Sequence, residues 1–375
     1  MALVAMRVYE VRVKILSPTI ITRRKTENGF LGPLDYIPAQ TLRGAVVSSL
    51  FMEGLMDRNR MRAEEEAPTV LSSPAYPVIG GARTYPAHPF AMECKVCAEK
   101  GEATLVGELD PRKLEDSLAE RRDLELVPVE CGSGHRALKP LHPNKFLVLE
   151  GGKFSAPKER RGGMKAEGGS SASAEKSHSV SVAISRGRAA GIKGMLYHYE
   201  FLMSGKEFWA TLVLPAELSI PGNGLQLMIG RGVSRGFGRA KMHVVGEVTS
   251  SFSGTVKVLY ALSPTLGASD GNSTYPSTIE LRDVARRFGL EAERTVRVSR
   301  AYGRTIWVSA GWSMVRGEPR PRVLCRAQGS LLVLEDQVEG EASKALSLLR
   351  YTGTVTELNG RKVFGFNHLV PLGCM

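Results

Sequence analysis

The chain has 375 residues, of which 43% are hydrophobic, and its 50 Lys and Arg against 38 Asp and Glu give a formal net charge of +12. This length allows two buried cores, and the positive charge favours a polyanionic partner, although a thermophile's charged surface would give a similar excess. No run of about 18 apolar residues is present, which excludes a membrane-spanning helix, and the N-terminus lacks a signal-peptide core, so we expect a cytoplasmic protein.

The N-terminal segment predicts a strand, a long loop and a helix, in that order. Apolar and charged residues alternate over residues 7–16, which is typical of a half-buried strand. A loop rich in Pro and Gly follows, and residues 41–56 then place Leu42, Val46 and Leu50 at helical spacing. These elements predict an α+β fold that begins with the first half of a ferredoxin-like unit.

Residues 93–130 differ from the rest of the chain, because eleven acidic residues outnumber six basic ones. Together with the cysteines of this region, the composition predicts an insertion at about residues 82–145 with its own small core. The low-complexity sequence of residues 151–179 predicts a flexible loop.

Three cysteines and a histidine in this insertion form a C-x2-C…C-x3-H pattern: Cys94, Cys97, Cys131 and His135. Two residues between the first cysteines allow one turn to present both sulfurs to a tetrahedral ion, and cytoplasmic thiols are reduced or metal-bound. A Cys3His set fills four positions, which predicts a closed, structural zinc site. His88 or His142 could replace the histidine, and free buried thiols are the alternative.

The tetrapeptide Leu-Ser-Pro-Thr occurs twice, at residues 16–19 and 262–265, each time after an alternating strand. We call each copy an opener. A glycine-rich closing turn follows each opener downstream, GRGVSRGFGRA at residues 230–240 and NGRKVFGFNH at residues 359–368. An opener and a closing turn repeated in the same order predict two related units in tandem.

Both closing turns mix glycine with basic residues, which suits contact between the backbone and phosphate. Glycine accepts positive φ and lets amide N–H groups face an anion, and arginines add charged hydrogen bonds. The residues that predict this contact are Gly230, Arg231, Gly232, Arg235, Gly236, Gly238 and Arg239 in the first turn and Gly360, Arg361 and Lys362 in the second. Phe237 could stack on a base or pack into the core. A plain glycine-rich hairpin without a ligand is the alternative.

Several segments, in their order along the chain, resemble the RAMP superfamily of CRISPR-associated proteins: the openers, IPAQTLRGAV, SRGRAAGIKGMLYHYEFL, SRGFGRA, AQGSLLVLE and RKVFGFNHL. The resemblance spans nearly the whole chain and points to the large two-domain RAMP subunits of type III effector complexes, particularly of the III-D kind. It implies two tandem ferredoxin-like domains of the RNA-recognition-motif (RRM-like) type, residues 1–250 and 254–375, with a zinc-ribbon-like insertion in the first.

The resemblance also implies a role in antiviral defence, as a non-catalytic subunit of a ribonucleoprotein complex. Such a subunit would bind the repeat-derived 5′ tag of the guide RNA and contact other RAMP subunits and the large subunit. The residues that it implies at the RNA are Thr41, Arg43, Arg231, Ser234, Arg235, Arg239, Arg361 and Lys362. Two positions depart from the family pattern, since IPAQ stands for IPGS and Asn367 stands for the last glycine of the second turn.

The helix that Pro38 and Thr41 would open presents free N–H groups and a positive dipole end next to Arg43. This arrangement favours a phosphate contact there. An intramolecular salt bridge of Arg43 is the alternative.

Some RAMP relatives cleave RNA without a metal, using a histidine as general acid or base. The candidates in this chain are His178, within the predicted flexible loop, His198, on a predicted strand, and His368. A structural role is favoured for His198, and a flexible loop would not hold His178 in place for catalysis. A binding subunit is therefore favoured over an enzyme. A metal-independent RAMP endoribonuclease that processes precursor guide RNA is the alternative function, and an unrelated scaffold with a zinc knuckle is a third.

Overall fold

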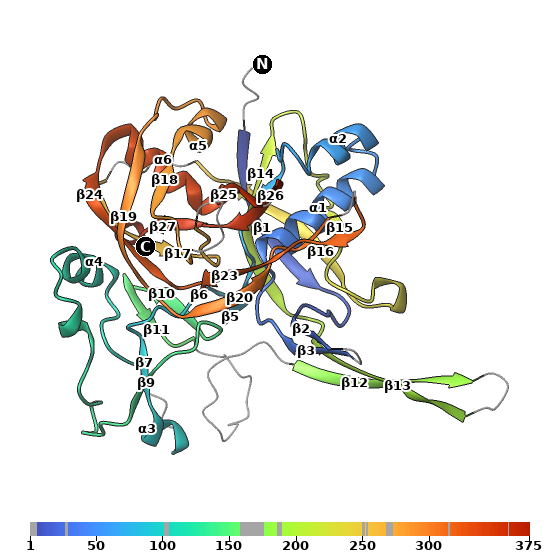
Figure 1. Cartoon of the computed structure of the whole chain (residues 1–375), viewed down its shortest axis with the longest axis horizontal. Coiled ribbons are helices and arrows are strands. Elements are labelled where there is room, and N and C mark those ends of the chain that lie inside the picture. Colours follow the sequence, from blue (N-terminus) through green and yellow to red (C-terminus); the bar gives the residue numbers. More distant parts are fainter. Residues whose placement is uncertain are drawn as a thin grey trace.

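The computed structural model describes residues 6–26, 29–100, 105–157, 176–185, 190–249, 252, 254–267, 273–313, 316–358 and 360–375. Within this part of the chain the protein is an α+β molecule that consists mostly of strands (Figure 1). No helix among the described residues is long and apolar enough to cross a membrane.

The larger sheet is centred on β1 (Met6–Ile15), which pairs antiparallel with β14 on one side and β16 on the other. Val11, Val13 and Ile15 are buried whereas Lys14 is exposed, so the alternation predicted for this strand is confirmed. The strands, in spatial order, are β11 (Lys153–Ser155), β10 (Phe146–Glu150), β6 (Ala82–Pro86), β5 (Tyr76–Ile79), β14 (Glu207–Pro215), β1, β16 (Arg239–Glu247) and β15 (Leu225–Met228), and β4 (Leu71–Ser72) also pairs with β14.

Helix α1 (Ala39–Met52) covers this sheet, and α2 (Arg58–Ala63) follows it. Leu42, Val46 and Leu50 are fully buried in the core that α1 shares with β1, as their helical spacing predicts. The helix begins two residues earlier and ends four residues earlier than the sequence pattern indicated. The chain turns there at Gly54, which has a positive φ of 73°.

The second sheet has five strands and is likewise antiparallel in the pairs that join β17, β24, β19 and β27. Its spatial order is β18 (Thr278–Glu280), β19 (Thr295–Tyr302), β24 (Leu331–Val338), β17 (Val256–Ala261) and β27 (Leu369–Pro371). Helices α5 (Arg282–Arg287) and α6 (Gly340–Thr352) bury Val284, Leu346 and Leu349 against this sheet.

Smaller sheets and hairpins complete the fold. They are β2 (Thr22–Thr26), β3 (Gly29–Pro33), β12 (Lys176–Ser185) and β13 (Ala190–Leu202) in one sheet, and the pairs β20 (Thr305–Ser309) with β23 (Arg322–Arg326), β21 (Trp312–Ser313) with β22 (Glu318–Pro319), and β25 (Thr354–Leu358) with β26 (Arg361–Phe366). In Figure 1, β12 and β13 extend from the body beside β2 and β3. The chain ends in a short turn, η3 (Leu372–Cys374).

The acidic region forms a small substructure at the edge of the molecule, drawn at the lower left of Figure 1. Its elements are β7 (Met92–Cys94), α3 (Lys95–Glu99), β8 (Leu105–Val106), α4 (Pro111–Ala119), η1 (Asp123–Leu126) and β9 (Leu138–Pro140). Helix α4 packs on the second sheet, where the buried Glu115 accepts hydrogen bonds from the backbone N–H groups of Lys257 at 3.2 Å and Val258 at 3.3 Å.

The loop predicted at residues 151–179 has ordered ends. Residues 153–155 form β11 and residues 176–179 belong to β12, so the predicted loop was too long at both ends. Phe154 is the one large apolar side chain in the two segments, and pairing with β10 and β13 rather than local composition decides their structure. The central part of the predicted loop, residues 158–175, lies outside the described residues.

Candidate nucleic-acid interface and metal centre

The first opener and the first closing turn are joined by backbone hydrogen bonds. The N–H of Leu16 donates to the carbonyl of Arg239 at 2.8 Å, and the N–H of Gly238 donates to the carbonyl of Pro18 at 2.9 Å. The N–H of Arg239 donates to the hydroxyl oxygen of Ser17 at 2.9 Å. The proline and serine of the opener thus hold the turn in place.

The second opener and closing turn are joined in the same way. The N–H of Leu262 donates to the carbonyl of His368 at 2.7 Å, and the N–H of Asn367 donates to the carbonyl of Pro264 at 3.1 Å. The N–H of His368 donates to the hydroxyl oxygen of Ser263 at 3.0 Å. Each bond has its counterpart in the first copy, so the repeat seen in the sequence is also a repeat of structure. The serines were not among the predicted site residues, although the repeated tetrapeptide contained the signal.

The residue opposite the opener's proline has a left-handed backbone in both copies. Gly238 has φ of 81°, and a Cβ added there would lie 2.2 Å from the carbonyl oxygen of Ile229. Asn367 occupies the equivalent position with φ of 55°. Asparagine adopts this conformation more readily than other non-glycine residues, which explains how the departure from glycine is accommodated.

The first closing turn presents polar side chains to solvent. The exposed residues are Arg231, Ser234, Arg235 and Arg239. The guanidinium of Arg235 donates to the hydroxyl of Tyr199 and lies 5.5 Å from that ring. Phe237 is half-buried and packs 5.6 Å from the ring of Phe201, which is the packing alternative considered for it.

Several amides of the first turn are used inside the protein. The N–H of Gly236 donates to Val233, and the N–H of Gly238 donates to the opener. The N–H of Arg231 donates to Ile20 at 3.0 Å. At these positions an anion would therefore be contacted by side chains, and not by the backbone N–H groups that the sequence analysis expected.

The second closing turn carries its basic residues in ion pairs. Arg361 lies 2.9 Å from Glu318, and Lys362 lies 3.0 Å from Glu357. Both basic side chains are partly exposed, and Gly360 is exposed at the tip with φ of 70°. Because each cation already has a carboxylate partner, this turn carries less free positive charge than its sequence suggested.

Arg43 lies inside the protein, 6% exposed, and its contacts are intramolecular. Its guanidinium donates to a carboxylate oxygen of Glu64 at 2.7 Å and to the carbonyl of Val70 at 2.6 Å. It also lies over the ring of Phe364, 4.1 Å from the centroid. Burial lowers the pKa of Arg43 despite the nearby Glu64, but a guanidinium remains charged. The salt bridge considered as the alternative for Arg43 is present, and the side chain is not available to RNA in this conformation.

The start of α1 is covered by the second closing turn. Thr41 is half-buried in the first helical turn, and its N–H donates to the carbonyl of Pro38 at 2.9 Å. Gly365 packs on this end, since a Cβ placed there would lie 2.8 Å from the amide nitrogen of Gln40. At this point the helix N-terminus, where an anion was expected, contacts the second closing turn instead.

The three histidines considered for catalysis lie in different environments. His178 and His198 are exposed on the paired strands β12 and β13, and His178 is opposite Glu200. The expectation that His178 lies in a flexible loop was wrong. His368 is 1% exposed, with its Nδ1 3.1 Å from the Ser263 hydroxyl, and burial lowers its pKa to about 3.

The four predicted metal ligands come together in the insertion, and their ligand atoms all lie within 4.8 Å of one another. The sulfurs of Cys97 and Cys131 are 3.8 Å apart, and the Nδ1 of His135 is 3.4 Å and 3.5 Å from them. A tetrahedral zinc ion with ordinary bond lengths requires a separation of about 3.8 Å between sulfurs and about 3.5 Å between sulfur and nitrogen. The Cys94, Cys97, Cys131 and His135 cluster therefore fits a metal ion such as zinc.

Local structure explains how these ligands meet. Cys94 ends β7 and precedes α3, so the helix returns Cys97 toward it. A tight turn brings the other pair together, because the N–H of Cys131 donates to the carbonyl of His135 at 2.9 Å. The two substitutes considered for the histidine do not join the cluster, since His88 packs 5.2 Å from the ring of Phe154 and His142 accepts from the N–H of Asn144 at 3.2 Å.

The electrostatics of the cluster distinguish two of its thiols. Burial and the neighbouring thiols raise the pKa of Cys97 to about 11. Burial also disfavours the Cys131 thiolate, but N–H donors from Ser133 and His135 and the neighbouring thiols lower its pKa to about 6. A divalent cation would stabilise every thiolate in the set, because metal ligation requires the deprotonated sulfur.

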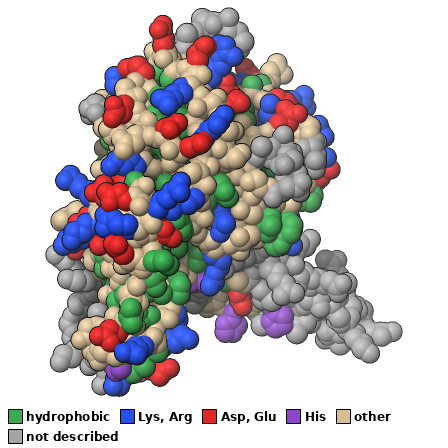
Figure 2. Space-filling model, turned by 60° about the vertical axis from the view of Figure 1, so that its left-hand side comes forward, with side chains coloured by type: hydrophobic (Ala, Val, Ile, Leu, Met, Phe, Trp, Pro, Cys, Tyr) green, Lys and Arg blue, Asp and Glu red, His purple; other side chains and the backbone are tan. Residues whose placement is uncertain are grey.

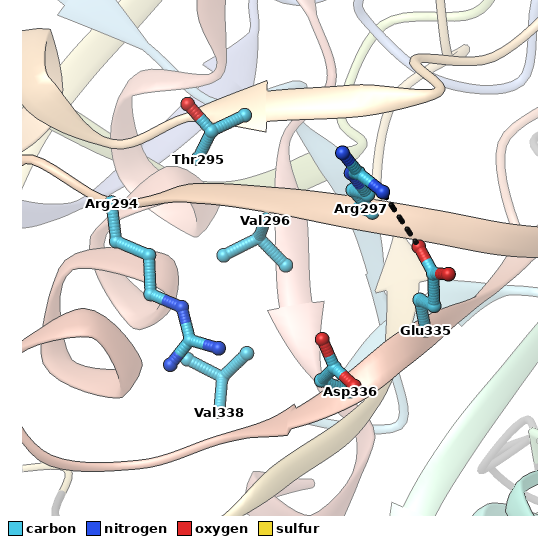
Figure 3. Close-up of a pocket in the computed structure, with 7 residues that line it drawn as sticks. All are labelled: Arg294, Thr295, Val296, Arg297, Glu335, Asp336 and Val338. Atoms are coloured by element: carbon cyan, nitrogen blue, oxygen red, sulfur yellow. Dashed lines mark ion pairs between the residues drawn. The ribbon is translucent and has the colours of Figure 1, made fainter.

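The charge on the molecular surface is mixed. On the face shown in Figure 2, Lys and Arg side chains are interspersed with Asp and Glu. The same mixture lines a small hollow between β19 and β24, where Arg294 and Arg297 meet Glu335 and Asp336, and Arg297 lies 3.9 Å from Glu335 (Figure 3). This hollow has no uniform sign of charge, so it offers no clear preference for an anion or a cation.

Comparisons with known proteins give similarity to solved structures only. No family model and no curated protein matches the chain. A chain of the type III-B Cmr-beta structure bound to cognate target RNA and AMPPnP is 13% identical, with 86% of both chains covered and a TM-score of 0.44. A second Cmr-beta structure, bound to cognate target RNA, is 13% identical, with 86% of both chains covered and a TM-score of 0.42. Oligomeric Cmr4 from Pyrococcus furiosus is 16% identical over 65% of this chain and 100% of that one, with a TM-score of 0.25. These scores are low, and the likeness carries no argument about ligands or activity.

Proposed function

We propose that this protein is a non-catalytic RNA-binding subunit of a type III CRISPR effector complex, in which it binds the repeat-derived 5′ tag of the guide RNA. The observation that carries the proposal is the doubled contact between opener and closing turn, in which Ser17 and Ser263 accept equivalent backbone hydrogen bonds. Of the segments that resemble the RAMP superfamily, the openers, SRGFGRA and RKVFGFNHL make these contacts. Its partners are the guide RNA, other RAMP subunits and the large subunit, in the cytoplasm.

The strand orders support two tandem ferredoxin-like domains, residues 1–250 and 254–375. In chain order, β17, β19, β24 and β27 are the four main strands of the second sheet, with α5 after the first and α6 after the third, and their spatial order is 4-1-3-2. The strands β1, β5, β14 and β16 have the same spatial order, with α1 after the first. In the first unit β15 and a short turn replace the second helix.

The RNA contact is proposed at the first closing turn. Arg231, Ser234, Arg235 and Arg239 are exposed there, on a backbone that the opener fixes. Guanidinium groups form strong, directional hydrogen bonds with phosphate. In the second turn, Arg361 and Lys362 would contact RNA only after exchanging their carboxylate partners for phosphate. Arg43 has a structural role, because it pairs with Glu64 inside the protein.

Zinc is proposed to stabilise the insertion through the Cys3His cluster. The set has the donor types and spacings of a closed structural site, so when bound the ion supplies folding energy. The zinc-ribbon-like description of the insertion rests on the three-stranded sheet β8-β7-β9 next to the cluster.

The proposal predicts that the double substitution Arg231→Ala with Arg235→Ala weakens binding of single-stranded guide RNA. Each charged hydrogen bond contributes roughly 1.5–3 kcal/mol, so we expect a loss of about tenfold or more at low salt, without unfolding. The measurement is a filter-binding titration at several salt concentrations. The slope of affinity against salt should also become shallower, because fewer counterions are released.

A matched control removes the same charge elsewhere. Arg282→Ala with Arg286→Ala alters two exposed arginines on α5 that pair with Glu293, and should leave the affinity nearly unchanged. Equal losses of RNA affinity in both double variants would show that the first closing turn contributes only non-specific charge. Site-specific cleavage of labelled repeat RNA in EDTA by the wild-type protein would favour the endoribonuclease instead.

A further inference from the structure

The hairpin of β20 and β23 has one buried and one exposed face. Its inner face contributes Val323 and Cys325 to a small apolar cluster, with Val308 packed against it. Its outer face carries Trp307, which is 62% exposed. Because the hairpin is anchored by its other face, the exposed indole is not explained by packing of the core.

A positive charge lies beside this indole. The guanidinium of Arg322 lies 6.0 Å from the Trp307 ring centroid. Trp307 is opposite Leu324, so Arg322 and Arg326 lie on either side of it along β23. The Arg326 guanidinium donates to the carbonyl of Gly303, which leaves Arg322 as the cation at the indole. Neither β20 nor β23 contains an acidic residue. Within the described part of the chain, no carboxylate forms an ion pair with Arg322.

The hairpin adjoins the repeated opener and closing-turn structure. The N–H of Thr265, in the second opener, donates to the carbonyl of Arg326 at 2.9 Å. At the other end of the hairpin, the Gln40 side chain donates to the carbonyl of Ser309 at 3.3 Å. In Figure 1, β20 and β23 lie across the middle of the molecule. The exposed indole is therefore held by the same framework that carries the second closing turn.

We propose that Trp307 and Arg322 form a stacking site for an unpaired nucleobase of RNA, an inference that rests on the proposed RNA-binding function. An indole stacks on any base, and a neighbouring guanidinium contributes a cation–π contact and a charge for the adjoining phosphate. On the outer face of β20, the neighbours of Trp307 are Thr305 and Ser309, both exposed and polar. Apart from Leu324 opposite it, the outer-face neighbours of Trp307 are polar or cationic, which suits a base with its phosphate better than the broad apolar surface of a protein partner.

The test uses the full-length protein and single-stranded oligoribonucleotides. Trp209 is buried, so a Trp312→Phe background leaves Trp307 as the exposed fluorophore among the three tryptophans. Added RNA should quench its fluorescence. Trp307→Ala should lower RNA affinity by roughly 5- to 100-fold, as expected for loss of one stacked base, whereas Trp307→Phe should retain most of it. Trp312→Ala, which removes a tryptophan of similar exposure from β21, is the matched control.

Heparin, a polyanion without bases, separates stacking from charge. Trp307→Ala should bind heparin as the wild type does, and an equal loss for heparin and RNA would overturn the stacking site. RNA affinity unchanged in Trp307→Ala, together with a loss in the Arg231 and Arg235 double variant, would overturn this inference and leave the proposed function intact. Unchanged RNA affinity with weakened assembly of the effector complex would make the surface a protein contact. Absence of RNA binding by the wild type would instead remove the proposed function itself.

Discussion

Arg43 shows why a side chain's role depends on contacts that are distant in sequence. Its motif, near the start of a helix, suggested a phosphate contact, but Glu64 and Phe364 enclose it. Arg320 also lies over the Phe364 ring, 4.8 Å from its centroid, and pairs with Glu65 at 3.1 Å. A sequence pattern could predict the cation but not which of 38 acidic residues would meet it.

At the residue scale, His368 predicts a dependence of stability on pH. Burial lowers its folded-state pKa to about 3, whereas an unfolded histidine titrates near 6.5. Between these values the unfolded chain binds the proton and the folded chain does not, so stability is full above about pH 6.5 and falls as the pH decreases. We expect this residue to remove about 2 kcal/mol of unfolding free energy between about pH 7 and pH 5. Urea unfolding at the two pH values measures the loss.

The variant His368→Gln isolates this contribution, because other acid-sensitive groups, including His88 with its similarly lowered pKa of about 3, are common to both proteins. The variant should lose less stability on acidification than the wild type, whatever its stability at neutral pH. An identical pH dependence in the two proteins would contradict the assignment.

At the scale of elements, local sequence signals were most reliable where one physical requirement dominated. Alternation identified β1, helical spacing identified α1, and glycine identified the closing turn around Gly238. The function of the turn's amides was not predictable, because two of the acceptors, the carbonyls of Pro18 and Ile20, are remote in the chain. The structured ends of the predicted loop at residues 151–179 were missed for the same reason.

Substitutions at equivalent positions of the two turns should have different consequences. Gly238→Ala forces a left-handed residue with a Cβ into the carbonyl of Ile229, and should destabilise the protein by about 1–3 kcal/mol. Asn367→Gly keeps the conformation but removes hydrogen bonds from the side chain to both backbone groups of Leu266. It should cost a similar amount, about 1–3 kcal/mol, for a different reason. Chemical unfolding measures both.

The exposed Gly236 provides the comparison, since an added Cβ there meets nothing within 4 Å. Gly236→Ala carries only the backbone penalty of its positive φ, so it should destabilise the protein less than Gly238→Ala does. The reverse order would show that close approach to Ile229 is not what requires glycine at position 238.

For the whole molecule, the repeat of opener and closing turn was visible in the sequence, and so was the Cys3His cluster. The placement of the insertion was not, because α4 packs on strands that follow it by more than a hundred residues. Composition indicated an insertion with its own small core. The cysteines have such a core, with Val96, Val106 and Leu138 packed against them, whereas α4 belongs to a cluster shared with both sheets that includes Phe146, Leu118 and Tyr260.

Loss of the metal should therefore destabilise the backbone beyond the four ligands. Cys97→Ser should abolish zinc binding and increase hydrogen exchange across residues 90–135, since structural zinc supplies folding energy. This range includes α4, which lies in the chain between Cys97 and Cys131 and packs on the second sheet. Mass spectrometry measures both the metal content and the exchange.

Cys374→Ser is the control, because this cysteine lies outside the cluster and should leave the metal content unchanged. A wild-type protein purified without chelators that contains almost no zinc would contradict the metal assignment. Unaltered exchange in a zinc-free protein would instead show that the cluster is dispensable for the fold.

The carboxylate of Glu115 has a consequence for how the chain is made. Its backbone partner at Lys257 is 142 residues further along. During translation, α4 therefore emerges long before β17, whose N–H groups donate to the Glu115 carboxylate. Until β17 is present, water must solvate this carboxylate. The insertion can therefore complete its packing only after the second sheet has been synthesised.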